Sequence, residues 1–206
     1  MARLTTPRPA AAAGGNGQGG NGQGGNGQGN GCFLKGTNIR TAEGDRKVED
    51  LSPGDLLPTV FGGTCLIQWI GHYSLKKSDP TNAWVKKVLP VRFTRSALGL
   101  DVPCADLYIT QEHALLIDGV LVTAGSLING TTITVYNPRE LDELEFFHIK
   151  LERHNAIYAE GAPCETMISV EESAVNFDEY LRDYGRPAIQ EARCAPLLSC
   201  NGVGAK

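Results

Sequence analysis

The chain has 206 residues, of which 41% are hydrophobic and 20% are charged, so it is long enough to bury the core of one domain. Its 19 Lys and Arg residues and 23 Asp and Glu residues give a formal net charge of -4, and the basic residues do not cluster, which argues against nucleic acid as a partner. No apolar run reaches the roughly 18 to 20 residues that cross a bilayer. We therefore expect neither nucleic acid nor a membrane as a partner. We also expect a monomer.

Residues 1–31 differ in composition from the rest of the chain. Residues 14–31 hold 11 of the 25 glycines, in a run where Gly-Gly-Asn-Gly-Gln occurs three times. Such a segment has no side chains to bury and a high chain entropy. We expect a disordered leader over residues 1–31 and one domain over residues 32–206.

The segments after the leader are short, and most of them alternate apolar and polar residues. Glu43-Gly44-Asp45, Phe61-Gly62-Gly63 and Asp118-Gly119 are turn signals between such segments. The expected strands cover residues 37–41, 46–48, 56–60, 64–70, 107–110, 114–117, 120–123, 131–136, 145–152 and 156–159. This spacing of strands and turns predicts an all-β fold.

One helix is expected near the C-terminus. Asn176 and Glu179 have the spacing of a capping box before Phe177, Tyr180 and Leu181, and Gly185 would end the helix.

Six cysteines are present, and their spacing matches no common metal motif. Small buried hydrophobes are the expected role of all but Cys32, although Cys194 and Cys200 are close enough for a local disulfide. We expect no cofactor and no metal, and a zinc site made by His148, His154 and two cysteines stays an open alternative.

The first residue of the expected domain is a cysteine preceded by Gly31. The Cys32 thiolate is placed next to its own backbone amide and can attack the carbonyl carbon of Gly31, which is an N-to-S acyl shift. Because the product is a thioester, the site must distort the peptide, stabilise the oxyanion and protonate the departing amine. A glycine before the cysteine permits an unusual backbone geometry.

A second group of candidate residues is Thr110-Gln111-Glu112-His113, at the end of an expected strand. A strand end holds side chains more firmly than a free loop does. His113 could protonate the scissile nitrogen while the Thr110 hydroxyl holds the peptide or fixes the imidazole tautomer. A histidine in a surface turn is the alternative.

Several motifs of the chain, in their order and spacing, resemble the Hedgehog/intein (Hint) autoprocessing domain. The residues that carry this resemblance are Gly31-Cys32-Phe33, Gly36-Thr37-x-Ile39-x-Thr41, Val48-Glu49-Asp50-Leu51-x-x-Gly54-Asp55, Thr110-x-x-His113, Phe147-His148-Ile149-x-Leu151 and His154-Asn155. Bacterial Hint-type domains are similar also in Pro90-Val91-Arg92, in an Ala159-Glu160-Gly161 strand and in a Cys194-Ala195-Pro196 tail.

The resemblance implies a compact all-β horseshoe with the cysteine near its centre. It implies that Cys32 is the nucleophile, that His113 activates the scissile peptide and that Thr110 assists. His148 stands where many inteins carry an aspartate. Strand alternation places His148 opposite Phe147 and Ile149, so it either takes part in the reaction or faces water.

We therefore expect a single-turnover, self-cleaving domain that acts in cis on the Gly31-Cys32 bond. Its substrate would be its own N-terminal segment, and water or another small nucleophile would resolve the thioester. Protein splicing is disfavoured because Ala156, and not Cys, Ser or Thr, follows His154-Asn155. A catalytically silent binding domain and a Cys/His peptidase that acts in trans remain alternatives. A secreted or cell-surface location is suggested by the resemblance alone.

Overall fold

The computed structural model describes residues 31–77, 79–85, 88–170, 172–186 and 192–198. The expectation of a disordered leader therefore falls on residues outside the described part, except for Gly31, and so does half of the suggested Cys194–Cys200 pair. Cys194 itself is a free cysteine.

The described chain is built from β-strands of 2 to 13 residues, with short 3-10 helices and one α-helix, so the predicted all-β class is confirmed. The 3-10 helices are η1 (Val48–Asp50) and η3 (Ala124–Leu127). The strands are β1 (Phe33–Leu34), β2 (Asn38–Thr41), β3 (Gly44–Lys47), β4 (Leu56–Pro58), β5 (Thr64–Lys76), β6 (Val91–Phe93), β7 (Leu107–Ile109), β8 (Ala114–Ile117), β9 (Val120–Thr123), β10 (Ile133–Val135), β11 (Glu143–Leu151), β12 (Ala156–Ala159) and β13 (Ala162–Glu165).

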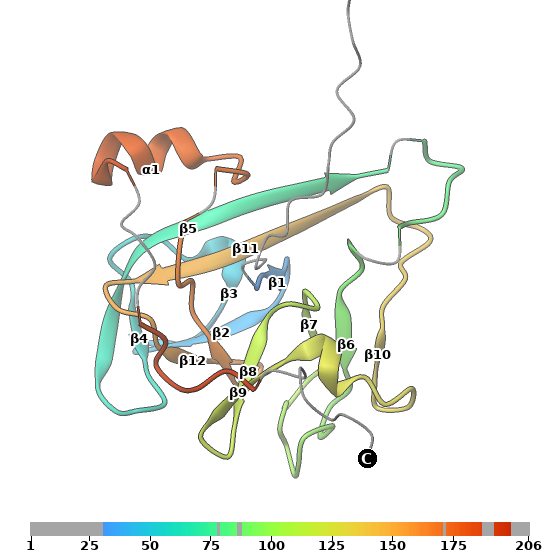
Figure 1. Cartoon of the computed structure of the whole chain (residues 1–206), viewed down its shortest axis with the longest axis horizontal. Coiled ribbons are helices and arrows are strands. Elements are labelled where there is room, and N and C mark those ends of the chain that lie inside the picture. The colour runs from blue at the N-terminus through green and yellow to red at the C-terminus, as the bar shows by residue number, and fades with distance from the viewer. Residues whose placement is uncertain (1–30, 78, 86–87, 171, 187–191, 199–206) are drawn as a thin grey trace, which may run out of the picture.

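The strands form two antiparallel sheets. One has the order β10-β6-β7-β1-β11-β5-β4 and the other has the order β3-β2-β12-β13-β8-β9. Figure 1 shows the long β5 and β11 side by side along one edge of the molecule, with β6, β7 and β10 at one end. Strands that are far apart in the sequence are thus neighbours, which brings the ends of β1, β7 and β13 into one region.

Strand β1 is only two residues long, but it is central to the larger sheet. Phe33 pairs with Ile109 of β7 on one side and with Phe147 of β11 on the other. Strands β1, β6 and β13 were not expected from the sequence, and β1, with two residues, is too short to show a periodicity. This pairing fixes the position of Cys32, the residue immediately before β1.

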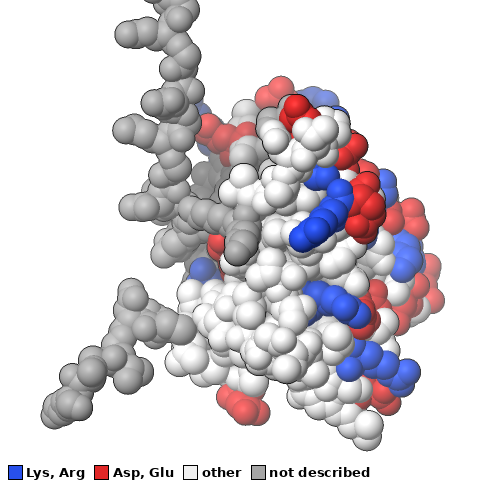
Figure 2. Space-filling model, turned by 90° about the vertical axis from the view of Figure 1, so that its right-hand side faces the viewer, with Lys and Arg blue, Asp and Glu red and all other residues white. Residues whose placement is uncertain are grey.

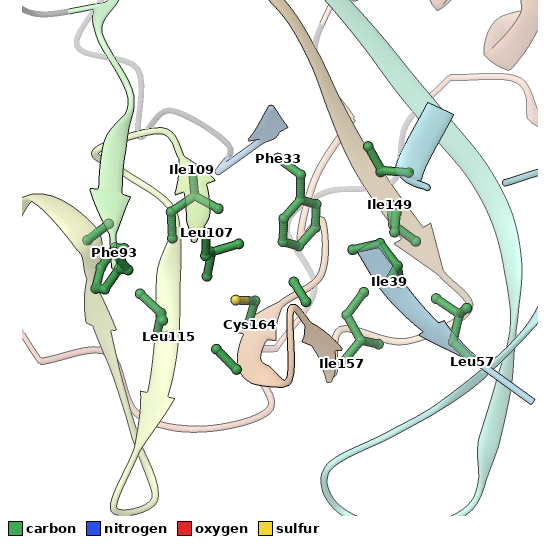
Figure 3. Packing of buried hydrophobic residues seen from close by; sticks show 14 of the residues in the cluster. Phe33, Ile39, Leu57, Phe93, Leu107, Ile109, Leu115, Ile149, Ile157 and Cys164 are labelled. Atoms are coloured by element: carbon green, nitrogen blue, oxygen red, sulfur yellow. The ribbon is translucent and has the colours of Figure 1, made fainter. Parts of the chain in front are cut away.

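The main core lies between the two sheets. Figure 3 shows the Phe33 ring between Ile109 and Leu107 on one side and Ile149 and Ile39 on the other. All five side chains are fully buried. Burial of a phenylalanine contributes about 1.5 to 3 kcal/mol, so Phe33 anchors the start of β1.

Two hairpins end in turns whose residues have positive φ angles. Asp118 and Gly119, which connect β8 and β9, have φ angles of 48° and 82°. Glu160 and Gly161 connect β12 and β13 with φ angles of 46° and 77°. The first turn confirms the prediction, whereas the expected strand through Ala159-Glu160-Gly161 is wrong, because the chain reverses there.

Helix α1 (Phe177–Tyr184) confirms the expected helix and its end at Gly185, but the predicted capping box does not form. The Asn176 side chain instead accepts a hydrogen bond from the N–H of His72 and donates one to the carbonyl of Ile70, at 3.0 and 2.9 Å. Asn176 thus ties the helix to β5, and Figure 1 shows the helix beside that strand.

Charged side chains of both signs are interspersed on the surface. On the face in Figure 2, Lys and Arg atoms lie next to Asp and Glu atoms, and a broad area carries neither. Within the described residues, no helix is long and apolar enough to cross a membrane.

Candidate functional site

The Gly31-Cys32 peptide is buried and is held by the end of β7. The N–H of Cys32, which belongs to this peptide bond, donates a hydrogen bond of 2.9 Å to the Thr110 hydroxyl. In return, the N–H of Thr110 donates to the Cys32 carbonyl at 3.0 Å. The Thr110 side chain therefore contacts the nitrogen that would leave if this peptide were cleaved.

Gly31 lies directly against His113. A Cβ atom added to Gly31 would lie 2.3 Å from Cα, 2.4 Å from Cγ and 2.5 Å from Cβ of His113. These distances are far below van der Waals contact, so no larger residue fits at position 31 without displacing this histidine. The structure thus brings Gly31, Cys32, Thr110 and His113 together from two distant parts of the sequence.

The His113 ring is fully buried, and its tautomer is fixed by strand β13. Its Nε2 is 3.1 Å from the backbone carbonyl of Glu165, and because a carbonyl oxygen only accepts, Nε2 carries the hydrogen. The other ring nitrogen, Nδ1, is buried and has no hydrogen-bond partner in the described part of the chain. In the neutral ring Nδ1 can therefore accept a proton.

Burial lowers the pKa of His113, because the charged imidazolium loses its hydration. The negative charge of Glu165 and the backbone of Cys32 act in the opposite direction and favour the protonated ring. His113 is therefore a neutral base with an acidic neighbour placed to stabilise its charged form.

His148 does not face water, so that alternative is wrong. It is 1% exposed, because both faces of β11 are covered in this region. Its ring centroid is 5.7 Å from that of His113, and neither of its nitrogens has a hydrogen-bond partner among the described residues. Burial, together with the nearby His113 and His154, holds the pKa of His148 well below its usual range.

Glu165, the last residue of β13, contacts both His113 and His154, and it was not among the candidates expected from the sequence. One carboxylate oxygen accepts the N–H of Ala114 at 3.0 Å. The other is 3.3 Å from Nε2 of His154 and 2.8 Å from Nη1 of Arg193. Burial opposes the ionisation of Glu165, but the hydrogen bond from His154 and the charges of His113 and Arg193 together lower the pKa of the carboxyl below its usual range. An acidic residue in the otherwise uncharged segment Ala162–Glu165 was the signal that could have identified it.

The Cys32 side chain borders an apolar cluster rather than the solvent. Cys32 is 6% exposed and belongs to a cluster with Trp84, Leu89, Leu144 and Phe146. Such a dry environment strengthens electrostatic effects on a reaction at this residue.

The open alternative of a zinc site finds no support in the geometry. Among the residues that the structure describes, no group of three or more His, Cys, Asp or Glu side chains is placed to hold a metal ion. His154 instead accepts the N–H of Cys194 at its Nδ1 atom, at 2.9 Å.

Comparisons with known proteins give one matching family model and several similar solved structures. The model of the Hint domain family matches residues 31–171, which is more than half of the chain. No curated protein matches the chain. Among solved structures, the chain is similar to a DnaB intein from Synechocystis sp. PCC 6803, with 14% identity, a TM-score of 0.45 and coverage of 67% of this chain and 99% of that one. It is also similar to a bacterial intein-like domain from Clostridium thermocellum, with 14% identity, a TM-score of 0.47 and coverage of 66% and 97%.

Proposed function

Because the chain belongs to the Hint domain family, whose members process their own peptide chains, we propose that it cleaves itself at the Gly31-Cys32 bond. The substrate is the segment that ends at Gly31, and the reaction occurs once, in cis. The observation that carries this proposal is the packing of Gly31 against His113 while Thr110 holds the N–H of Cys32.

In the first step the sulfur of Cys32 attacks the carbonyl carbon of Gly31. A C–S bond forms, the C–N bond breaks, and the thiol proton ends on the nitrogen of Cys32, so the step is an isomerisation to a thioester with a free amine. His113 is the group proposed to carry this proton, since its Nδ1 is unprotonated in the neutral ring and its ring lies against the scissile peptide. Thr110 holds the leaving nitrogen in place.

In the second step water or another small nucleophile attacks the thioester. His148 is the base proposed for this step, because its two nitrogens are buried, lack partners among the described residues and lie beside His113. Its lowered pKa keeps the imidazole neutral near pH 7, which a base requires. The water oxygen bonds to the carbonyl carbon, the C–S bond breaks, and the Cys32 thiolate regains a proton.

The test is the intact mass of the purified full chain, incubated with and without hydroxylamine or a thiol. The wild-type chain should split between Gly31 and Cys32, and either nucleophile should accelerate the split, because it attacks a thioester far faster than an amide. The variant Cys32→Ala should stay intact. Cys104→Ala is the matched control, since Cys104 is a free and exposed cysteine, and it should cleave as the wild type does. A wild-type chain that stays intact with either nucleophile would favour the alternative of a silent binding domain.

A further inference from the structure

A short C-terminal segment contacts Glu165 and His154 of the candidate site. Residues 193–198, which we call the C-terminal strap, lie beyond residues 31–171 that match the family model. The strap runs beside β9, where the N–H of Leu121 donates to the Pro196 carbonyl at 2.7 Å and the N–H of Leu198 donates to the Leu121 carbonyl at 2.8 Å. Figure 1 shows this dark red segment next to β8 and β9.

The strap contributes two polar contacts to the buried histidine cluster. The guanidinium of Arg193 is 2.8 Å from a carboxylate oxygen of Glu165. The backbone N–H of Cys194 donates to Nδ1 of His154, so the neutral His154 ring must carry its hydrogen on Nε2, the atom that faces the same Glu165 oxygen. Ala195 is buried against Ala114, Leu121 and Ala156 and holds the strap in this register.

These contacts act on the proposed proton carrier through Glu165. Its backbone carbonyl binds Nε2 of His113, and its carboxylate is fixed by the N–H of Ala114, the residue after His113. A buried carboxylate needs charged or hydrogen-bonding partners to remain ionised, and two of the three partners of Glu165 depend on the strap.

We infer that the C-terminal strap completes the active site: Arg193 and the Cys194 amide are positioning groups that hold Glu165 ionised, so that Glu165 orients His113 and stabilises its charged form during the acyl shift. This inference rests on the proposed function. It assigns a role in self-cleavage to residues outside the part of the chain that the family model matches.

The full-length variant Arg193→Gln tests the inference, with Arg182→Gln as the matched control. Arg182 is an exposed arginine of helix α1 that pairs with Asp183. Arg193→Gln should lower the rate of hydroxylamine-induced cleavage about tenfold or more, since loss of orientation at a reacting group costs about that much. Arg182→Gln should leave it unchanged, and Arg193→Lys should restore part of the rate.

The pH profile separates positioning from a general loss of structure. The groups that face Glu165 are His113, His154 and Arg193, with Cys164 beside it and His148 close to both histidines. Without Arg193 the carboxyl should take up a proton at higher pH, so the acid limb of the cleavage rate should move to higher pH while Arg182→Gln leaves it in place.

A second variant pair tests the backbone contact. Cys194→Pro removes the N–H that His154 accepts, whereas Cys194→Ala keeps it. In the uncleaved Cys32→Ala background, Cys194→Pro should change the ¹⁵N shifts of the His154 ring and Cys194→Ala should not.

If the wild type cleaves and Arg193→Gln cleaves at the same rate with the same pH profile, this inference is wrong and the proposed function stands. If the wild type does not cleave, both fall.

Discussion

The two ends of strand β13 each hold a buried carboxylate, but their surroundings differ. Glu160, in the turn before the strand, is 7% exposed and accepts hydrogen bonds from the backbone and side-chain amides of Asn38. Glu165, at the other end, is 6% exposed and contacts His154 and Arg193 with its carboxylate and His113 with its carbonyl. The partners of Glu160 are neutral amides, whereas Glu165 has, besides the Ala114 amide, partners that change or carry charge.

This difference separates a structural contact from a candidate reaction site. Amide donors hold a turn and two neighbouring strands together, and they do not ionise near neutral pH. Imidazole groups take up and release protons in this pH range, and the pKa values of His113, His148 and Glu165 are shifted from their usual ranges. Burial of a polar group is thus common to both ends, and the type of partner distinguishes them.

The largest effect is expected for His113→Ala, in the histidine cluster beside Glu165. Protonation of the leaving amine is part of the acyl shift, so both spontaneous and thiol-induced cleavage should slow by about 10² to 10⁴-fold. The rate is measured from the intact mass as a function of time, and Thr110→Ala should have a smaller effect. Equal rates in the wild type and His113→Ala would show that this histidine is not the proton carrier.

His148→Ala should affect the second step and spare the first. Spontaneous hydrolysis should slow by about 10²-fold, because the water loses its base. Hydroxylamine needs little base assistance and should restore cleavage of this variant to nearly the wild-type rate. Hydrolysis that is as fast as in the wild type between pH 5 and 8 would assign the acceptor step to another group.

Most strands, their turns and the candidates Gly31, Cys32, Thr110 and His113 could be predicted, because local periodicity, turn residues and short motifs carry that information. Two features depended on contacts between distant segments. The burial of His148 could not be predicted, since alternation shows which side chains share a face and not whether that face is covered. Glu165 interacts with residues 11 to 52 positions away, and no local pattern marks such a set.

The stability of the folded protein should depend on pH because of two buried histidines, His113 and His148. The pKa values of His113 and His148 are lowered in the folded protein, whereas in the unfolded chain a histidine takes up a proton near pH 6.5. The unfolded state therefore binds more protons as the pH falls below about 6.5, and the free energy of unfolding should decrease by about 1.4 kcal/mol per pH unit for each histidine that stays neutral. Urea unfolding of Cys32→Ala at pH 7.5 and at lower pH measures this slope, which should become shallower by one proton in Cys32→Ala/His148→Gln. An unchanged slope in the double variant would show that His148 is protonated to the same extent in both states.

The smallest effect on cleavage is expected for Glu160→Gln, in the turn before β13. The Gln carbonyl oxygen can still accept from Asn38, but a neutral acceptor forms weaker hydrogen bonds than a carboxylate, so the free energy of unfolding should fall by about 1 kcal/mol. Among the described residues, the hydrogen bonds of the Glu160 carboxylate reach no group of the candidate site. The cleavage rate should therefore stay within about twofold of the wild type.

Glu165→Gln makes the same chemical change at the other end of β13, yet it should slow cleavage about tenfold or more, since His113 and Arg193 lose their counter-charge. Urea unfolding and hydroxylamine-induced cleavage, measured on both variants, give the two effects separately. If the two substitutions slow cleavage equally, the partner type of a buried carboxylate does not distinguish the two ends, and Glu165 is a structural residue like Glu160.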